Sequence, residues 1–306
     1  MTRYLSLRLA YSLPAVWLIL TMVFALAQMI PGDPVQQMLG EGATLSDQVE
    51  LRHALGLDKP VPVQYERYLA GAVRGNLGES FRFQQPVLRV VLEHYPATLE
   101  LALAALIVCC AIGIPAGIIA AQRRATLADH AVGFFTLLGL SVPNFALGPL
   151  LILIFSVAIG WFPVSGRGGI SHLVLPAITL GAALAAILTR MVRTSVLEQL
   201  SSDYVRTARA KGLSERAVLL RHAFRNALIP ILTILGLQFG TLLAGTIVTE
   251  TIFSWPGIGR LAVQSIEARD YPLLQGCILV IAVSYVLVNL LTDLVYAFAD
   301  PRVRLQ

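Results

Sequence analysis

The chain has 306 residues, of which 56% are hydrophobic and 13% are charged, and its formal net charge is +5. Soluble domains carry about 25% charged residues, so this composition excludes an ordinary soluble protein and indicates a membrane protein. The positive charge does not indicate nucleic-acid binding, because no aromatic and basic array or nucleic-acid-binding motif accompanies it.

Six apolar segments have the length of roughly 20 residues that a helix needs to cross a bilayer. They are Leu9–Ile30, Ala97–Ala121, Ala131–Ile159, Leu173–Met191, Leu228–Val248 and Gly276–Phe298. The first segment follows Arg3 and Arg8 as a secretory signal would, but its length favours a retained span. The sequence therefore predicts an all-α membrane protein with six transmembrane helices, the first of them within residues 1–30.

Basic residues predict the orientation of these spans. With the N-terminus in the cytoplasm, 14 of the 23 Lys and Arg residues lie inside, and only Arg167, Arg260 and Arg269 lie in the two short outer loops. Cytoplasmic loops carry the excess of basic residues. We therefore expect both termini and the insert at 203–228 in the cytoplasm, and residues 31–96 outside.

The outer segment at 31–96 forms a small periplasmic region in this prediction. It opens with the turn signal Pro31-Gly-Asp-Pro34, and a polar helix follows that ends at Gly56-Leu-Asp58. We expect a second helix over Tyr65–Val73 and a turn at Gly75-Asn-Leu-Gly78. We see no catalytic constellation in it, and Asp33 is interpreted as a turn former.

Two spans contain features that could form a transport pathway. The third span is interrupted between Ser141 and Pro149, where Pro143 and Asn144 leave backbone groups that need protein neighbours or a water-filled cavity. The fifth span carries a stripe of small residues suited to close helix contact at Gly236, Gly240 and Ala244. On its other faces, Gln238 and Thr241 could meet solute or another helix.

Three acidic residues of the spans leave two interpretations open. Glu100 and Glu250 lie near the outer ends of their spans and anchor the interface or line a cavity. Asp293 lies deeper, and intramembrane acids often mark functional sites. It lies near enough to the end of the sixth span for water or Arg302 to reach it, so structural pairing is the favoured interpretation.

The polar insert between the fourth and fifth spans predicts helix, tight turn, helix and membrane span. Asp203 is expected to cap a short helix, and Gly212 to end it in a left-handed turn. Ser214 is expected to cap a second helix with Glu215 in its first turn, and Pro230 to open the next span. A structured basic loop of this kind in a membrane protein typically docks a partner.

Several kinds of chemistry are absent from the sequence. It has no phosphate-binding loop for ATP, no nucleophile elbow and no zinc-protease motif. Cys109, Cys110 and Cys277 lie in predicted spans and are interpreted as packing residues. The five histidines have no ligand spacing. The sequence therefore predicts no catalytic residue, no metal site and no cofactor on this chain.

The segments Asp203–Gly212 and Arg221–Pro230 resemble the cytoplasmic "EAA" loop of permease subunits of bacterial type I ABC importers, in the peptide/nickel branch. Further matches are Pro31-Gly-Asp-Pro34, Gly75-Asn-Leu-Gly78, Glu250–Gly257, Arg269-Asp-Tyr-Pro272 and Asp300-Pro-Arg302. The Pro-Gly-Asp-Pro turn resembles the B-type partner of a permease pair. Two departures are Arg206 in place of the loop's glutamate, and Arg225 where a proline is usual.

The resemblance implies a type I permease fold with a transport core over 97–299, a coupling loop over 203–230 and a cytoplasmic tail over 300–306. It implies a heterodimer with a second permease in the bacterial inner membrane, two ABC ATPases that hold ATP and Mg, and a periplasmic binding protein. The implied ATPase-coupling residues are Ala208, Ala210, Lys211, Gly212, Leu213, Ser214, Glu215 and Arg216. The candidate pathway residues are Pro143, Asn144, Gln238, Thr241 and Glu250.

The substrate is left open by the sequence. The resemblance favours di- or oligopeptides, with glutathione among them, and nickel or another small solute is the alternative. A secondary transporter is the alternative of a different class. It would need paired intramembrane charges and typically an internal repeat, and the sequence shows neither.

Overall fold

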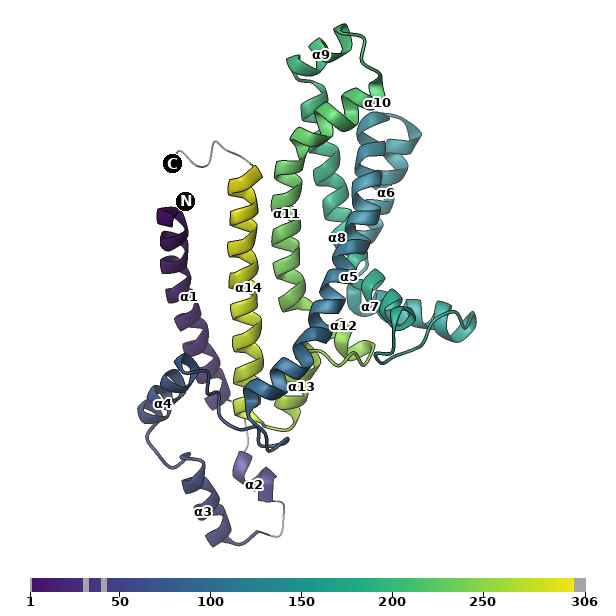
Figure 1. The fold of residues 1–306 in the computed structure, drawn as a ribbon. Helices are drawn as coiled ribbons and strands as arrows, with labels where there is room; N and C mark the ends of the chain where they lie inside the picture. The colour runs from purple at the N-terminus through teal and green to yellow at the C-terminus, as the bar shows by residue number, and fades with distance from the viewer. Residues whose placement is uncertain (1, 30–32, 40–42, 300–306) are drawn as a thin grey trace. The chain divides into compact units, whose positions relative to one another are not determined.

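The computed structural model describes residues 2–29, 33–39 and 43–299, and it divides into two compact units. The first unit contains residues up to Thr98 together with Pro256–Val286, and the second contains Leu99–Trp255 and the chain from Leu287. The described residues are almost entirely helical, which confirms the predicted fold class (Figure 1). The turn residues Pro31 and Gly32, the Asp300-Pro-Arg302 motif and the tail at 300–306 lie outside the described residues.

The first unit holds the N-terminal helix, the outer region and the last two helices. Its helices are α1 (Thr2–Met29), α2 (Pro34–Leu39), α3 (Leu45–Ala54), α4 (Val61–Val73), α13 (Ile258–Glu267) and the first part of α14 (Tyr271–Ala299). The second unit holds α6 (Leu127–Ser141), α7 (Asn144–Leu151), η1 (Ile152–Ala158), α8 (Ile170–Leu200), α9 (Asp203–Ala210), α10 (Glu215–Ala217), η2 (Val218–Ala223), α11 (Phe224–Gly245) and α12 (Ile247–Ile252). Helix α5 (Val87–Gln122) begins in the first unit and ends in the second.

Five helices of the described part, α1, α5, α8, the continuous α10–η2–α11 helix and α14, are long and apolar enough to cross a membrane. The pair formed by α6 and α7–η1 makes a sixth span if it is counted as one, although it is bent by 100°. Each predicted segment overlaps one of these regions. The third span, however, is not a straight helix.

The bend between α6 and α7 has a local cause. The pyrrolidine ring of Pro143 disfavours the helical region for the residue before it, and Val142 adopts an extended backbone with φ −89° and ψ 113°. Pro143 is extended as well, with φ −64° and ψ 144°, and Asn144 begins the next helix. The predicted break is therefore confirmed at Pro143.

The outer region begins with the short helices α2 and α3, which are stabilised by a capping box and an ion pair. Thr44 caps α3 with a full capping box, in which its side chain accepts from Asp47 and its amide donates to the Asp47 carboxylate. The guanidinium of Arg52 pairs with Asp33, so Asp33 joins α3 to the start of α2 in addition to forming a turn. Helix α4 confirms the predicted second helix and begins earlier than expected, at Val61.

The core of the second unit forms where α5, α8, η2 and α11 meet. Cys109, Leu188, Val192, Ala227 and Ile231 are fully buried there. Cys109 is therefore a packing residue, as predicted, and the close van der Waals packing of these side chains holds the helices together within the bilayer. Gly236 also packs closely, because a Cβ at this position would collide with the Thr292 side chain of α14.

Candidate functional site

The predicted coupling loop lies at one end of α8 and α11, and α7 and α12 lie at their other end (Figure 1). Helix α9 presents Val205 and Ala208 to Val218 of η2 and to Leu200 at the end of α8. Its other residues, Asp203, Tyr204, Arg206, Thr207, Arg209 and Ala210, are exposed. The apolar face of α9 therefore attaches it to η2 and to the end of α8. Its polar face is open to a partner.

Gly212 ends α9 in a left-handed conformation with φ +79°. The amide of Gly212 donates to the Arg209 carbonyl at 2.9 Å, and the amide of Leu213 donates to the Ala208 carbonyl at 3.4 Å. These two bonds are the pair that defines a Schellman motif, in which glycine is the usual left-handed residue. The predicted turn is confirmed, and it satisfies the last carbonyls of α9.

An ion pair across this turn was not predicted. Nε of Arg209 donates to Oε1 of Glu215 at 2.8 Å, and Nη2 donates to Oε2 at 3.2 Å. A bidentate pair has a defined geometry that a single contact lacks. Arg209 therefore links the end of α9 to the start of α10 across the turn. The opposite charges six residues apart were the only signal in the sequence, and their pairing depends on the turn between them.

Two details of the predicted loop are wrong. Ser202, not Asp203, is the N-cap of α9, and Asp203 is its first residue, where its charge pairs with Arg206 at 3.5 Å. The second short helix does not end before the membrane span. Ser214 is the predicted N-cap of α10, but α10, η2 and α11 follow one another without a break, and Pro230 lies inside α11. No glycine lies within residues 215–235, and the helix continues past Pro230.

The predicted coupling residues divide into an anchor and a surface. Ala208 is buried against Val218, so within the predicted coupling set it attaches α9 to η2. The seven residues Ala210–Arg216 are all exposed. Leu213 at the tip keeps 42% of its surface exposed. An apolar tip flanked by Lys211 and Arg216 is a suitable contact for another protein subunit.

The candidate pathway residues do not form one surface. Gln238 is buried, donates from Nε2 to the Leu184 carbonyl at 3.3 Å and accepts from the Cys109 thiol at 3.3 Å. It therefore meets other helices, which is the second of its two predicted alternatives. Thr241 is exposed but donates to the Leu237 carbonyl of its own helix at 2.7 Å. Pro143 is exposed and Asn144 is partly exposed at the bend.

Glu250 is neither an interfacial anchor nor part of an open surface in this chain. It is 0% exposed, and its Oε1 accepts from the Thr246 hydroxyl at 2.9 Å. Its carbonyl accepts from the amide of Trp255 at 2.8 Å, which folds the segment after α12 back on itself. Glu250 therefore stabilises this corner. Glu100 is half-exposed and pairs with Arg167 at 2.6 Å, as an interfacial anchor would.

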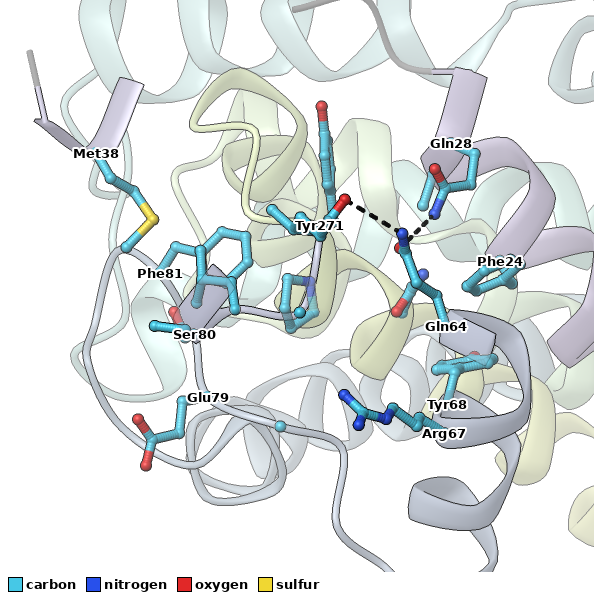
Figure 2. A pocket seen from close by; sticks show the side chains of 18 of the residues that line it. Phe24, Gln28, Met38, Gln64, Arg67, Tyr68, Glu79, Ser80, Phe81 and Tyr271 are labelled. Atoms are coloured by element: carbon cyan, nitrogen blue, oxygen red, sulfur yellow. Dashed lines mark hydrogen bonds between the residues drawn. The ribbon is translucent and has the colours of Figure 1, made fainter. Parts of the chain in front are cut away.

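A cavity of about 580 Å³ lies in the first unit, between α1, α4 and the first turn of α14 (Figure 2). Gln64 at its centre accepts from Gln28 at 3.2 Å and donates to the Lys59 carbonyl at 2.8 Å. The buried Tyr68 hydroxyl has no hydrogen-bond partner within the described ranges, and burial raises its pKa to about 12. None of the predicted pathway residues lines this cavity.

Known proteins similar to the chain were found by sequence and by structure. Residues 113–305 match the family described as binding-protein-dependent transport system inner membrane component, and residues 1–102 match its N-terminal family. The di/tripeptide transport system permease protein DppB of Pseudomonas aeruginosa is 45% identical over all of both chains. The glutathione permease GsiC and the dipeptide permease DppB of Escherichia coli K12 are each 42% identical over 99% of both chains.

Solved structures show the same fold at low identity. An inward-facing crystal structure of the MetNI methionine ABC transporter matches with a TM-score of 0.59 and 16% identity, over 70% of this chain and 97% of that chain. A second crystal form of that transporter matches with a TM-score of 0.60. These likenesses identify the type I permease fold.

Proposed function

Because the chain belongs to the family of binding-protein-dependent transport system inner membrane components, we propose that it is the permease subunit of an ATP-driven importer of di- and oligopeptides, with glutathione among its possible substrates. The observation that carries this proposal is 42–45% identity, over essentially the whole chain, to permeases named for dipeptides, di/tripeptides and glutathione. Nickel or another small solute is the alternative substrate. The chain is a transport component, not an enzyme.

The proposed partners follow from the family. We propose a second homologous permease as the other half of a heterodimer, two ABC ATPases that bind ATP and Mg, and a periplasmic solute-binding protein. In this proposal residues 97–299 are the transport core, with the coupling loop at 203–230 and a cytoplasmic tail at 300–306. This chain carries no cofactor of its own in the proposal.

The arrangement of the second unit supports a mechanical role for the coupling loop. An ATPase would contact the exposed residues Ala210–Arg216. The buried contacts of Val205 and Ala208 attach α9 to Val218, and Arg209 pairs with Glu215 across the turn. A displacement of the tip would therefore move η2. Because residues 215–245 form a continuous helix, the displacement would reach α12 at the opposite end.

Three of the candidate pathway residues are open on this chain. Asn144 and Pro143 at the bend and Thr241 on the exposed face of α11 are partly or fully open on this chain. We propose these three as pathway residues that a second permease would complete. Gln238 and Glu250 are proposed instead to hold the helices that carry them, since their side chains are buried.

Reconstitution in liposomes tests the proposed function. The chain alone is expected to show no ATP hydrolysis and no solute uptake, because it has no phosphate-binding loop. Together with the proposed second permease, ATPases and binding protein, radiolabelled dipeptide should accumulate only with ATP and Mg inside. Uptake by the chain alone under a proton gradient would support the secondary-transporter alternative. ATP-dependent accumulation of nickel, but of neither dipeptide nor glutathione, would replace the substrate assignment.

The proposed orientation places both termini and residues 203–228 in the cytoplasm, and residues 31–96 in the periplasm. Single cysteines at exposed Ser46 and Ser201, in a variant without native cysteines, test this orientation. Ser80 is unsuitable because it is buried and donates to Asp270. An impermeant thiol reagent applied to spheroplasts should label position 46 and leave position 201 unlabelled until the membrane is opened. The reverse pattern would invert the topology.

A further inference from the structure

A groove between α6 and α8 combines a basic end with an apolar wall. Its volume is about 560 Å³, and its lining includes His130, Gly133, Phe134, Leu137, Arg190 and Arg193. All of these residues belong to the second unit. None belongs to the proposed coupling surface or to the proposed pathway.

The charges in the groove are unbalanced. Asp129 accepts from Nε of Arg193 at 2.7 Å and from Nη2 at 2.8 Å, and from the amide of Ala125 at 3.0 Å. This bidentate pair compensates the carboxylate. Arg190, one turn earlier on α8, forms no ion pair or hydrogen bond with any side chain in the described part of the chain. The groove therefore presents an uncompensated guanidinium beside a neutralised pair.

The polar and apolar parts are ordered along α6. Asp129 and His130 lie in its first turn, and the basic pair Arg123 and Arg124 lies shortly before the start of the helix. Phe134 and Leu137 follow, with 59% and 61% of their surfaces exposed. A rise of about 1.5 Å per residue puts Leu137 roughly 12 Å from Asp129 along the helix. This is the order of a phosphate-containing headgroup followed by an acyl chain.

The space in the groove is open beside the apolar wall. A Cβ at Gly133 would have no atom within 4 Å. Arg190 lies in the C-terminal third of α8, and α8 is long and apolar enough to cross the membrane. Basic pockets between transmembrane helices on the cytoplasmic side bind anionic lipid headgroups, and the proposed orientation places this end of α8 on that side. A soluble anion would need the guanidinium but not the exposed apolar wall.

From this geometry we propose that the groove between α6 and α8 binds an anionic phospholipid. The phosphate lies at Arg190 and His130, and an acyl chain lies along Phe134 and Leu137. The proposal does not depend on the transported solute.

The test uses the intact transport complex in nanodiscs of phosphatidylcholine with a minor fraction of phosphatidylglycerol. After limited delipidation in detergent, native mass spectrometry measures the phosphatidylglycerol retained. The Arg190→Ala complex is expected to retain roughly fivefold less phosphatidylglycerol than the wild type. One basic residue near an anionic surface contributes about 1 kcal/mol, which corresponds to this factor. Arg190→Lys should retain more than Arg190→Ala. Arg74→Ala removes an exposed basic residue of the outer region, outside both the groove and the coupling loop, and should match the wild type.

A second variant distinguishes a lipid-binding site from a site for a soluble anion. Gly133→Leu fills the open space without changing the charge, so it should lower phosphatidylglycerol retention. Inorganic phosphate should not displace the lipid. Equal lipid retention in wild type and Arg190→Ala, with both complexes intact by size-exclusion chromatography, would overturn the proposal. Displacement by inorganic phosphate together with an unaffected Gly133→Leu variant would show an anion site in place of a lipid site.

Discussion

Replacement of Gly212 by valine is expected to abolish ATP-driven transport while leaving membrane insertion intact. The left-handed backbone at Gly212 costs a residue with a side chain about 1–2 kcal/mol, and more for a β-branched one. A Cβ at Gly212 would meet no atom within 4 Å, so the effect arises from the backbone and not from a collision. Relief of the strain would open the Schellman turn and change the angle of α9. Ligand-stimulated transport and ATP hydrolysis in the reconstituted complex measure the loss.

Two matched variants separate coupling from strain. Gly75→Val introduces the same residue at φ +72°, also with no atom within 4 Å of the new Cβ, but in the outer region. It should carry a similar strain and keep ATP-driven transport. Gly212→Asn should recover part of the activity, because asparagine tolerates the left-handed region. Normal ligand-stimulated transport in Gly212→Val, with the ATPases still bound, would contradict the coupling role of this turn.

Removal of the Asp270 carboxylate is expected to give a large loss of stability. Asp270 is fully buried, caps α14 by accepting from the amide of Leu273 at 3.1 Å, and accepts from the Ser80 hydroxyl and from the Arg82 amide. Alanine would leave buried donors without an acceptor and remove a helix cap. The free energy of unfolding of the first unit should fall by about 3 kcal/mol or more. Thermal denaturation of the purified complex, with limited proteolysis of residues 74–86, measures this loss.

The control for Asp270 is another acidic residue of the first unit. Asp58 pairs with His53 at 2.7 Å at the surface, and this hydrogen bond holds the pKa of its carboxyl below the usual value. Asp58→Ala should shift the denaturation midpoint far less than Asp270→Ala, because solvent screens an exposed pair. Asp270→Asn keeps an acceptor oxygen and should fall between the two. Equal shifts for Asp58→Ala and Asp270→Ala would show that the buried contacts do not stabilise the unit.

Features that depend on residues close in the chain could be predicted from the sequence. The apolar runs determined the five membrane-crossing helices and the bent pair α6 and α7–η1, because a helix in a bilayer needs length and hydrophobicity. Pro143 determined the break, since a proline restricts the residue before it. Gly212 determined the end of α9, where a left-handed residue satisfies the last carbonyls. The loop motif around Gly212 also indicated the family, which the sequence relatives confirm.

Tertiary structure decided which of the polar residues are buried and what they bind. The sequence could not place Glu250 and Gln238 in the interior or Ala208 against Val218, because burial depends on how helices distant in the chain pack together. The same holds for the Asp129 and Arg193 pair, 64 residues apart, and for Ser80 and Asp270, 190 residues apart. Local patterns therefore determined which segments are helical and apolar enough to cross the membrane, although they misplaced some helix ends, such as the start of α4 and the end of α10. Packing alone decided which side chains hold these helices together and which remain open to a partner.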